Sequence, residues 1–339
     1  MNLGYCYYHK PGKKHVDYGR SIVDKEPAAD LQKTYFQIEA PDVIRLEFKI
    51  IYPGLLIGLG YEHPKVEEND FAAGFMFDHT TGMPYIPGSS VKGILRSAFP
   101  NNDNDEGRIK FINGLLENNL KYKEIYAIEK RIFGNRPNKK RDTERKYQDI
   151  FYDGYVSEVT TEAGGLFAEE YITPHKDAVT NPIPIKLLKI APANIITLQF
   201  GLNPDKAGKL TPAERLKLYA GIILYLGLGA KTNVGFGQLD EKFTQTILKR
   251  KEQQEQEQAR IEKEQAHLAQ MNPVDRIFEE FKKNLPDIVN AMRNDKIDSA
   301  LKPELAQAMK ERYISLKIWH KPKKKKDFKR VAYLQTILD

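Results

Sequence analysis

The stretch around residue 230 constrains the fold more than any other, because four glycines fall within eleven residues there. They follow an apolar segment with helical spacing and are Gly227, Gly229, Gly235 and Gly237. Glycine tolerates positive φ and the close approach of other backbone, so the spacing predicts a helix that ends in a sharply turning loop. We call residues 227–237 the glycine loop.

Three polar residues lie inside the glycine loop, namely Lys231, Thr232 and Asn233. A cation, a hydroxyl and an amide on glycine-rich backbone favour an anion cradle of N–H groups. A helix end followed by a tight turn into a strand would explain the same glycines. Both interpretations stay open on this stretch alone.

Composition limits the class of protein. The 339 residues carry 53 Lys and Arg against 46 Asp and Glu, a net charge of +7 that fits a polyanionic partner without requiring one. The single cysteine excludes a disulfide framework and a zinc site ligated by cysteines. No apolar run reaches membrane-spanning length, and the N-terminal residues lack the apolar core of a signal peptide. We therefore expect a cytoplasmic protein with one large domain and a smaller one, no membrane partner and no cofactor.

A second glycine-containing region, residues 82–99, predicts a helix. Ser89 or Ser90 is the expected N-cap, and apolar residues follow at the spacing of one helix face, namely Val91, Ile94, Leu95 and Ala98. Exposed N–H groups at such a start, beside serines and a lysine, form a natural phosphate site. A capped core helix with a solvated edge explains the pattern equally well.

Three further residues of this helix carry separate expectations. Lys92 and Arg96 lie four positions apart, on one polar stripe, and are candidates for phosphate contacts. Gly93 inside a helix costs about 1 kcal/mol relative to alanine. That cost predicts that another group packs or binds closely at Gly93.

Apolar periodicity predicts the other elements of an α+β domain. Strand patterns cover residues 42–52, 150–159 (strand, turn and strand), 187–200 (a strand pair) and 236–239. Helical patterns cover residues 108–133 and 213–226. The second of these helices begins with a capping box between Thr211 and Glu214 that has proline at the first helical position.

Two segments have the composition of nucleic-acid contacts. Residues 136–146 are polar and strongly basic, through Arg136, Lys139, Lys140, Arg141, Arg145 and Lys146. Such a segment often contacts nucleic acid, although a solvated loop is also common. Residues 2–15 mix aromatic and basic side chains, which could stack on bases and contact phosphates or could form an ordered edge strand.

The composition changes abruptly after residue 243. Residues 244–270 are rich in Lys, Glu, Gln and Ala and predict a long solvated helix or semi-rigid linker. Residues 271–339 predict a few short helices, with a lysine run near the end that is typical of a solubilising patch. The expected division is a large domain at 1–243, a charged helical linker at 244–270 and a small helical tail domain at 271–339.

Tests for catalytic motifs favour a binding protein over an enzyme. Lys231 and Thr232 follow an alanine and a helix, whereas a Walker motif needs glycine before the lysine and a strand before the loop. Carboxylates and histidines gather between residues 63 and 79, including Asp70 and Asp78, without metal-ligand spacing or a catalytic frame. Solvated loop charges are the favoured interpretation. We expect no catalytic residue and no metal site.

Several segments occur together in the order and spacing of one known family. They are residues 56–60, 81–96, 132–134, 151–153 and 227–237. With its proline-glycine-serine-serine helix start and its glycine loop, the chain resembles the RAMP superfamily of CRISPR effector subunits. Within that superfamily it looks most like the sixth subunit of type III-B Cmr complexes. The similarity extends over residues 2 to 243.

This resemblance implies a ferredoxin-like (RNA-recognition-motif-like) core that binds guide RNA through its backbone and caps a filament of subunits near the 3′ end of the guide. The partners it implies are the guide CRISPR RNA, the target RNA, the repeated backbone subunit and the first Cmr subunit, in a ribonucleoprotein of antiviral defence. Related backbone subunits cleave target RNA with an aspartate after the first strand, in the region of Asp70 and Asp78. A non-catalytic subunit is the expected function, and a metal-dependent endoribonuclease is the alternative.

The expected RNA-contacting residues combine the bottom-up candidates with this resemblance. They are Ser89, Ser90, Lys92, Arg96, Arg136, Lys139, Lys140, Arg141, Gly229, Lys231, Thr232, Asn233 and Gly235.

Overall fold

The computed structural model describes residues 37–40, 43–58, 75–135, 148–172, 185–203, 210–322 and 324–339. The chain forms two compact units, Met1–Glu252 and Gln253–Asp339. The boundary between them falls within a single helix, α8, Glu241–Gln270. Each unit is described separately below.

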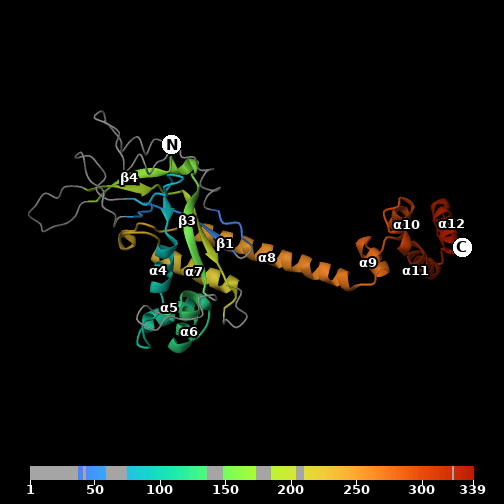
Figure 1. Cartoon of the computed structure of the whole chain (residues 1–339), viewed down its shortest axis with the longest axis horizontal. Helices are drawn as coiled ribbons and strands as arrows, with labels where there is room; N and C mark the ends of the chain where they lie inside the picture. The colour runs from blue at the N-terminus through green and yellow to red at the C-terminus, as the bar shows by residue number, and fades with distance from the viewer. Residues whose placement is uncertain are drawn as a thin grey trace, which may run out of the picture. The chain divides into compact units, whose positions relative to one another are not determined.

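An antiparallel sheet of four strands forms the centre of the first unit (Figure 1). Its strands are β1 (Val43–Lys49), β6 (Ile195–Gly201), β3 (Ile150–Glu158) and β2 (Tyr85–Ile86), in that spatial order. Apolar residues alternate along β6, where Ile196, Leu198 and Phe200 are fully buried, so one face of the sheet carries the core. A separate two-stranded sheet pairs β4 (Phe167–Ile172) with β5 (Ile185–Ile190).

The strand predictions need three corrections. Residues 150–159 form one strand with a register shift between Tyr152 and Tyr155, not two strands with a turn. The expected pair at 187–200 consists of β5 and β6, but β5 pairs with β4, and β6 pairs with β1 and β3. Residues 236–239 form only an isolated bridge, Leu239 with Ile50.

Four helices accompany the sheet, and α4 and α7 pack against one another. They are α4 (Gly88–Ser97), α5 (Glu106–Leu116), α6 (Tyr122–Phe133) and α7 (Pro212–Leu226). The expected helix at 108–133 is therefore two helices, because Glu117 has φ 50° and ends α5. The predicted capping box of α7 is confirmed: the Thr211 hydroxyl accepts from the Glu214 amide at 3.2 Å, and the Glu214 carboxylate accepts from the Thr211 amide at 2.7 Å.

A buried polar cluster fixes α7 to the start of β3. The hydroxyl of Tyr219 donates to Asp149 Oδ2 at 2.6 Å, and the guanidinium of Arg215 forms an ion pair with the same carboxylate. Burial raises the pKa of Asp149, whereas the charge of Arg215 and the hydrogen bond from Tyr219 lower it. The Tyr219 ring also packs on Phe151 and Phe200, so one side chain joins the helix to two strands.

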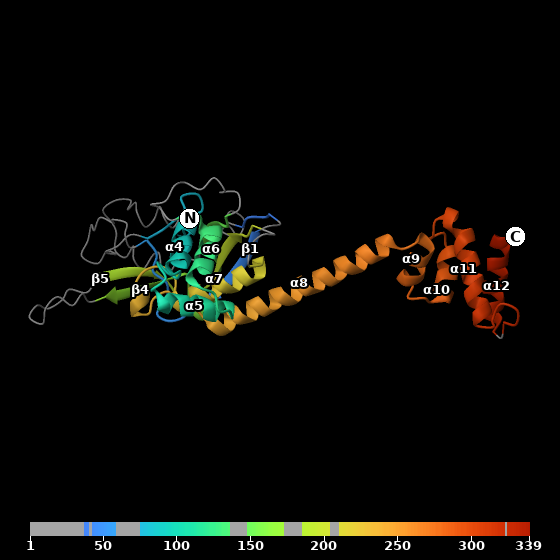
Figure 2. The same ribbon diagram turned by 90° about the horizontal axis from the view of Figure 1, so that it is seen from below.

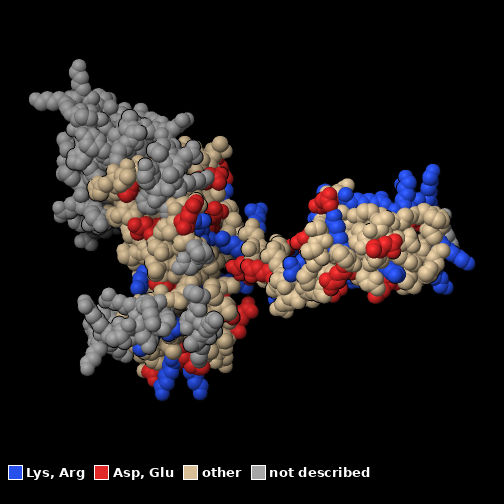
Figure 3. Space-filling model, turned by 45° about the vertical axis from the view of Figure 1, so that its right-hand side comes forward, with Lys and Arg blue, Asp and Glu red and all other residues tan. Residues whose placement is uncertain are grey.

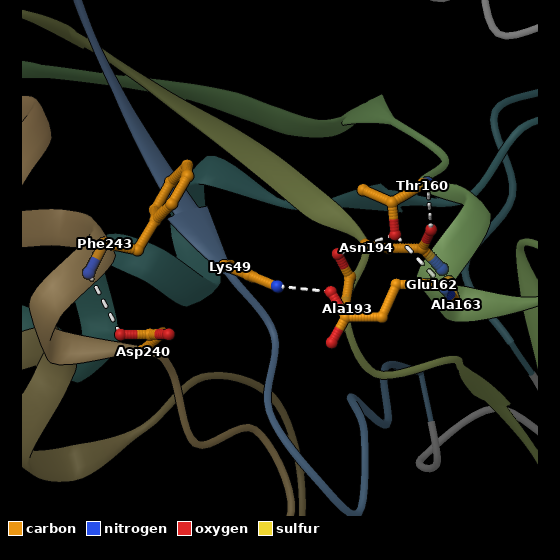
Figure 4. A network of polar contacts seen from close by, with 8 residues as sticks. All are labelled: Lys49, Thr160, Glu162, Ala163, Ala193, Asn194, Asp240 and Phe243. Atoms are coloured by element: carbon orange, nitrogen blue, oxygen red, sulfur yellow. Dashed lines mark hydrogen bonds and ion pairs between the residues drawn. The ribbon is translucent and has the colours of Figure 1, made fainter.

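A second polar network holds the turn between β5 and β6 (Figure 4). The side-chain amide of Asn194, fully buried, donates to the carbonyls of Gly165 at 2.9 Å, Ala191 at 3.2 Å and Leu166 at 3.3 Å, and its oxygen accepts from the Thr160 amide at 3.2 Å. Lys49 at the end of β1 pairs with Glu162 at 2.6 Å. These contacts tie segments that are distant in the sequence.

The second unit is helical and has its own core. After α8 come α9 (Pro273–Glu280), α10 (Leu285–Arg293), α11 (Lys302–Ser315) and α12 (Lys325–Leu338), all visible in Figure 2. Their buried apolar residues, among them Ile288, Met292, Leu305 and Leu334, form a cluster separate from that of the first unit. No helix among the described residues is long and apolar enough to cross a membrane.

Asn194→Ala should lower the free energy of unfolding by about 3 kcal/mol, because several buried carbonyls and one amide lose their partner together. Urea titration measures the change. The exposed Asn290→Ala is the control and should stay within about 0.5 kcal/mol of the wild type. A loss below about 1 kcal/mol for Asn194→Ala would contradict the bridging role.

Candidate nucleic-acid interface

The glycine loop and the start of α4 line one groove. The groove has a volume of about 460 Å³. On one side lie Ser89 and Ser90 of α4, and on the other lie Gly229 and Ala230 of the glycine loop. The remaining lining residues are Ile57, Gly58, Met76, Tyr85, Ile86, Pro87 and Ile94. We call this space the loop–helix groove.

Part of the glycine loop is fixed by contacts with residues 54–58. The amide of Ala230 donates to the Leu56 carbonyl, and the amide of Gly237 donates to the Gly54 carbonyl, both at 2.8 Å. A Cβ atom at Gly229 would lie 2.2 Å from the Leu56 oxygen. These glycines therefore serve close backbone packing, as the turn interpretation predicts.

The remaining part of the loop presents polar groups that are not used within the protein. Among the described residues, none accepts a hydrogen bond from the amides of Lys231, Thr232 or Asn233. The Lys231 side chain is exposed and forms no ion pair there, and its backbone is left-handed at φ 58°. Adjacent unpaired N–H groups beside a cation attract an anion. One loop thus combines a packed turn with amides that have no described acceptor, and the anion cradle stays a prediction.

The start of α4 differs from the prediction in its N-cap. Pro87 occupies that position, and neither Ser89 nor Ser90 caps the helix. The Gly88 amide donates to Asp153 Oδ1 at 2.7 Å, and a Cβ at Gly88 would lie 2.1 Å from the Phe151 carbonyl oxygen, so β3 holds the helix start.

Because they do not cap the helix, the two serines remain available to a ligand. Ser89 and Ser90 are exposed, and no described residue bonds their hydroxyls or the Ser89 amide. The first turn of α4 carries no acidic residue of its own, and the carboxylate at this end of the helix is that of Asp153, on the Gly88 amide.

Lys92 and Arg96 lie outside the lining of the loop–helix groove. The ammonium of Lys92 lies 5.9 Å from the Phe151 ring centroid, and its pKa is lowered by burial and then by the charge of Arg96. Arg96 donates to Glu129 Oε1 at 3.1 Å and to the Gly134 carbonyl at 2.9 Å, which joins α4 to the end of α6. An RNA contact by Arg96 stays a prediction, and the visible role of this residue is structural.

Two other expectations meet different outcomes. Apart from the backbone of α4 itself, no described atom lies within 4 Å of a Cβ built on Gly93, so no described group packs closely there, and close binding of a ligand stays a prediction. The basic segment with Arg136, Lys139, Lys140 and Arg141 lies outside the described residues, as do residues 2–15.

Of the two aspartates considered for catalysis, the structure describes only Asp78. Asp70 lies outside the described residues. The carboxylate of Asp78 accepts from the amide of Thr81 at 2.6 Å and from its hydroxyl at 2.9 Å, an arrangement that stabilises a turn. Where the structure describes the chain, no group of three or more His, Cys, Asp or Glu side chains could hold a metal ion.

The sequence interpretation missed two contributors. Tyr85 and Ile86 line the loop–helix groove from β2, and Asp153 positions the helix start from β3. Tyr85 and Ile86 stand directly before the Pro87-Gly88 helix start, which was a usable signal. Asp153 belongs to the family segment 151–153, but its contact with Gly88 had no local signal, because the two residues lie 65 positions apart.

Two glycine substitutions separate packing from strain. Gly229→Ala should lower the free energy of unfolding by about 3 kcal/mol or more, because its Cβ would overlap the Leu56 oxygen. Gly235 has φ +99°, and a Cβ built on it would have one described atom within 4 Å, Pro53 Cδ at 3.8 Å. Gly235→Ala should therefore lower the free energy of unfolding through backbone strain alone, by about 1 kcal/mol. Urea unfolding of both variants checks this order, and equal losses would contradict the backbone contact at residue 56.

Comparison with known protein families finds a match over the part of the chain that contains this site. The RAMP superfamily profile matches residues 47–240, a range that contains the whole loop–helix groove. No curated protein sequence shows significant similarity to the chain.

Two solved structures are similar over part of the chain. One is a type III-B Cmr-beta complex bound to cognate target RNA, with 25% identity, a TM-score of 0.40, and 59% of this chain and 58% of the other covered. Cmr6 from Pyrococcus furiosus shows 22% identity and a TM-score of 0.35, with 58% of this chain and 96% of the other covered. The chain thus matches only 58% of the length of the first structure. On the extent of the family match, the chain belongs to the RAMP superfamily.

Proposed function

We propose that this chain is a non-catalytic subunit of a type III-B (Cmr) CRISPR effector complex in antiviral defence. In this proposal it binds the guide RNA along its backbone near the 3′ end and caps the filament of repeated backbone subunits. The observation that carries it is the loop–helix groove, where the start of α4 and the glycine loop of a RAMP protein line one space.

The chemistry of the groove suits a ribose-phosphate strand. Residues 231–233 follow the lining residues Gly229 and Ala230 and offer unbonded amides and the exposed Lys231 to one phosphate beside the groove. The start of α4 offers a second position at Ser89 and Ser90, inside the groove. The serine hydroxyls can also donate to or accept from a 2′-hydroxyl. Contacts of this kind position RNA without reading its bases, as a subunit that serves guides of any sequence requires.

The strand and helix order supports a ferredoxin-like core within this proposal. After β1, the chain passes through β2, α4, α5 and α6 to β3, then through the paired strands β4 and β5 to β6, and finally through α7 to the bridge of Leu239 with Ile50. The sheet places β6 between β1 and β3. This is a β-α-β-β-α-β arrangement in which the last strand is reduced to one bridge and β2 is added at the other edge.

The proposed partners follow from the same assignment. The basic residues 136–146 would contact the guide–target duplex, because they concentrate positive charge in one segment between α6 and β3. The repeated backbone subunit and the first Cmr subunit are the proposed protein neighbours, and the cytoplasm is the proposed location.

A metal-dependent endoribonuclease is the second candidate function, and Asp78 is its only candidate aspartate within the described part of the chain. Its carboxylate is already engaged by Thr81, and no described cluster of metal ligands includes it. These two observations favour the non-catalytic subunit.

Lys231→Glu should reduce the affinity for guide RNA about tenfold, because one phosphate contact becomes a repulsion. Fluorescence anisotropy with unstructured RNA at several salt concentrations measures it, and the salt slope should fall by about 0.7 for each lost contact. The exposed Lys242→Glu carries the same charge change on α8, outside the glycine loop. Equal losses for both variants would remove the glycine loop from the RNA site.

Asp78→Asn and Asp70→Asn should leave every cut in the target RNA intact when each variant is assembled into the complex. Gel analysis of the cleavage products, with wild-type complex as the reference, reads this out. Disappearance of one specific cut in either variant would replace the non-catalytic assignment with the nuclease.

A further inference from the structure

Positive charge is concentrated in one short stretch of the second unit. Residues 317–330 hold eight of the 53 Lys and Arg but only one of the 46 Asp and Glu. The net charge of this stretch therefore equals the +7 of the whole chain, and the rest of the protein is balanced. Lys and Arg gather along the margin of this unit that is uppermost in Figure 3.

Five lysines of this stretch are exposed and form no ion pair with any described residue. They are Lys321, Lys324, Lys325, Lys326 and Lys329. Asp327, the single acidic residue, is occupied by Arg330 at 3.0 Å. Elsewhere in the unit lysines do find partners, as Lys302 does with Asp295 and Lys283 with Glu279. Mutual repulsion of unpaired lysines is relieved when a polyanion binds them.

Helix α12 adds an aromatic side chain to this surface. Lys325, Phe328 and Lys329 stand at i, i+3 and i+4 and so share one face of the helix. Phe328 is 60% exposed, whereas the opposite face packs Val331 and Leu334 into the core. The Phe328 ring therefore takes no part in the hydrophobic core of the unit.

We propose that this face of α12 (Lys325, Phe328 and Lys329), together with Lys321 and Lys324 just before the helix, is a second RNA site, specific for single strands. The lysines contact consecutive phosphates, and the ring of Phe328 stacks on a base. Basic groups around an exposed aromatic ring form the usual platform for unpaired nucleotides, because every base has a π-face but a duplex buries it. An anionic membrane fits less well, since Phe328 is the only large apolar side chain exposed on the described residues of α12.

This site is independent of the loop–helix groove, because each lies in a different compact unit with its own core. It would give the chain a second attachment to the same RNA or to a neighbouring strand. Two linked contacts raise the overall affinity without changing either one.

The test uses the full-length chain with Lys324→Glu, Lys325→Glu and Lys329→Glu combined. Its control combines Lys263→Glu, Lys282→Glu and Lys296→Glu, which are exposed, unpaired and equal in charge change. Binding to fluorescent oligouridine should weaken at least tenfold for the first variant, and the salt slope should fall by about 2 because three phosphate contacts are lost. The control should remain within about twofold of the wild type.

A second pair of variants tests the aromatic contact separately from charge. Phe328→Ala should lower affinity for oligouridine about tenfold without changing the salt slope, and Phe328→Leu should not restore it, because stacking needs a ring. Binding to a fully paired RNA duplex should be equal for Phe328→Ala and wild type. Circular dichroism and urea unfolding verify that the variants stay folded.

Three results would overturn the proposal. The patch variant could bind oligouridine as well as its charge-matched control does. Phe328→Leu could match the wild type. The patch variant could lose binding to phosphatidylserine vesicles while it retains RNA affinity, which would assign the surface to a membrane. Repeating the titrations in the Lys231→Glu background separates this site from the loop–helix groove.

Discussion

The contact of the glycine loop with residues 54–58 determines the geometry of the candidate site. Backbone hydrogen bonds from Ala230 to Leu56 and from Gly237 to Gly54 hold the loop in place, and only glycine at 229 permits that approach. Across the groove, Asp153 and the Phe151 backbone hold the start of α4 just as closely. Both walls are therefore built from fixed backbone, which is the preorganisation that an anion site needs.

Different residues of the glycine loop have different roles, which explains why its sequence supported two interpretations. Gly229 and Gly237 are required for packing, while residues 231–233 keep amides that no described group uses. Glycine spacing alone indicates a turn, and the lysine, threonine and asparagine between the glycines indicate a ligand. The structure shows that these signals come from different residues of the same loop.

Local sequence patterns predicted the capping box and the apolar helix faces. They could not predict contacts between residues that lie far apart in the sequence. The capping box at Thr211 and the apolar faces of α4 and α7 depend on neighbours within one turn, so the sequence contains them. The N-cap of α4 was wrong because the Gly88 amide is satisfied by Asp153, 65 positions away, and not by a nearby serine. The pairing of β5 with β4 and of β6 with β1 is likewise set by the whole sheet.

Arg96 shows the limit of interpreting charge from sequence. Its position on a polar stripe predicted a phosphate contact, yet it pairs with the buried Glu129 and joins two helices. Lys231, by contrast, has no partner among the described residues, and the same is true of the lysines on α12. Unpaired charge, which only a structure reveals, therefore separates side chains that are still available to a ligand from those already used to join two elements.

Amide hydrogen exchange of the chain with and without guide RNA tests the central claim most directly. Because the amides of Ser89, Lys231, Thr232 and Asn233 have no acceptor within the described protein, they should exchange fast in the free chain. Bound RNA should slow amide exchange at the start of α4 and at the glycine loop, and both segments should become protected at the same RNA concentration. Unchanged exchange at both segments, under conditions in which the RNA is bound, would contradict it.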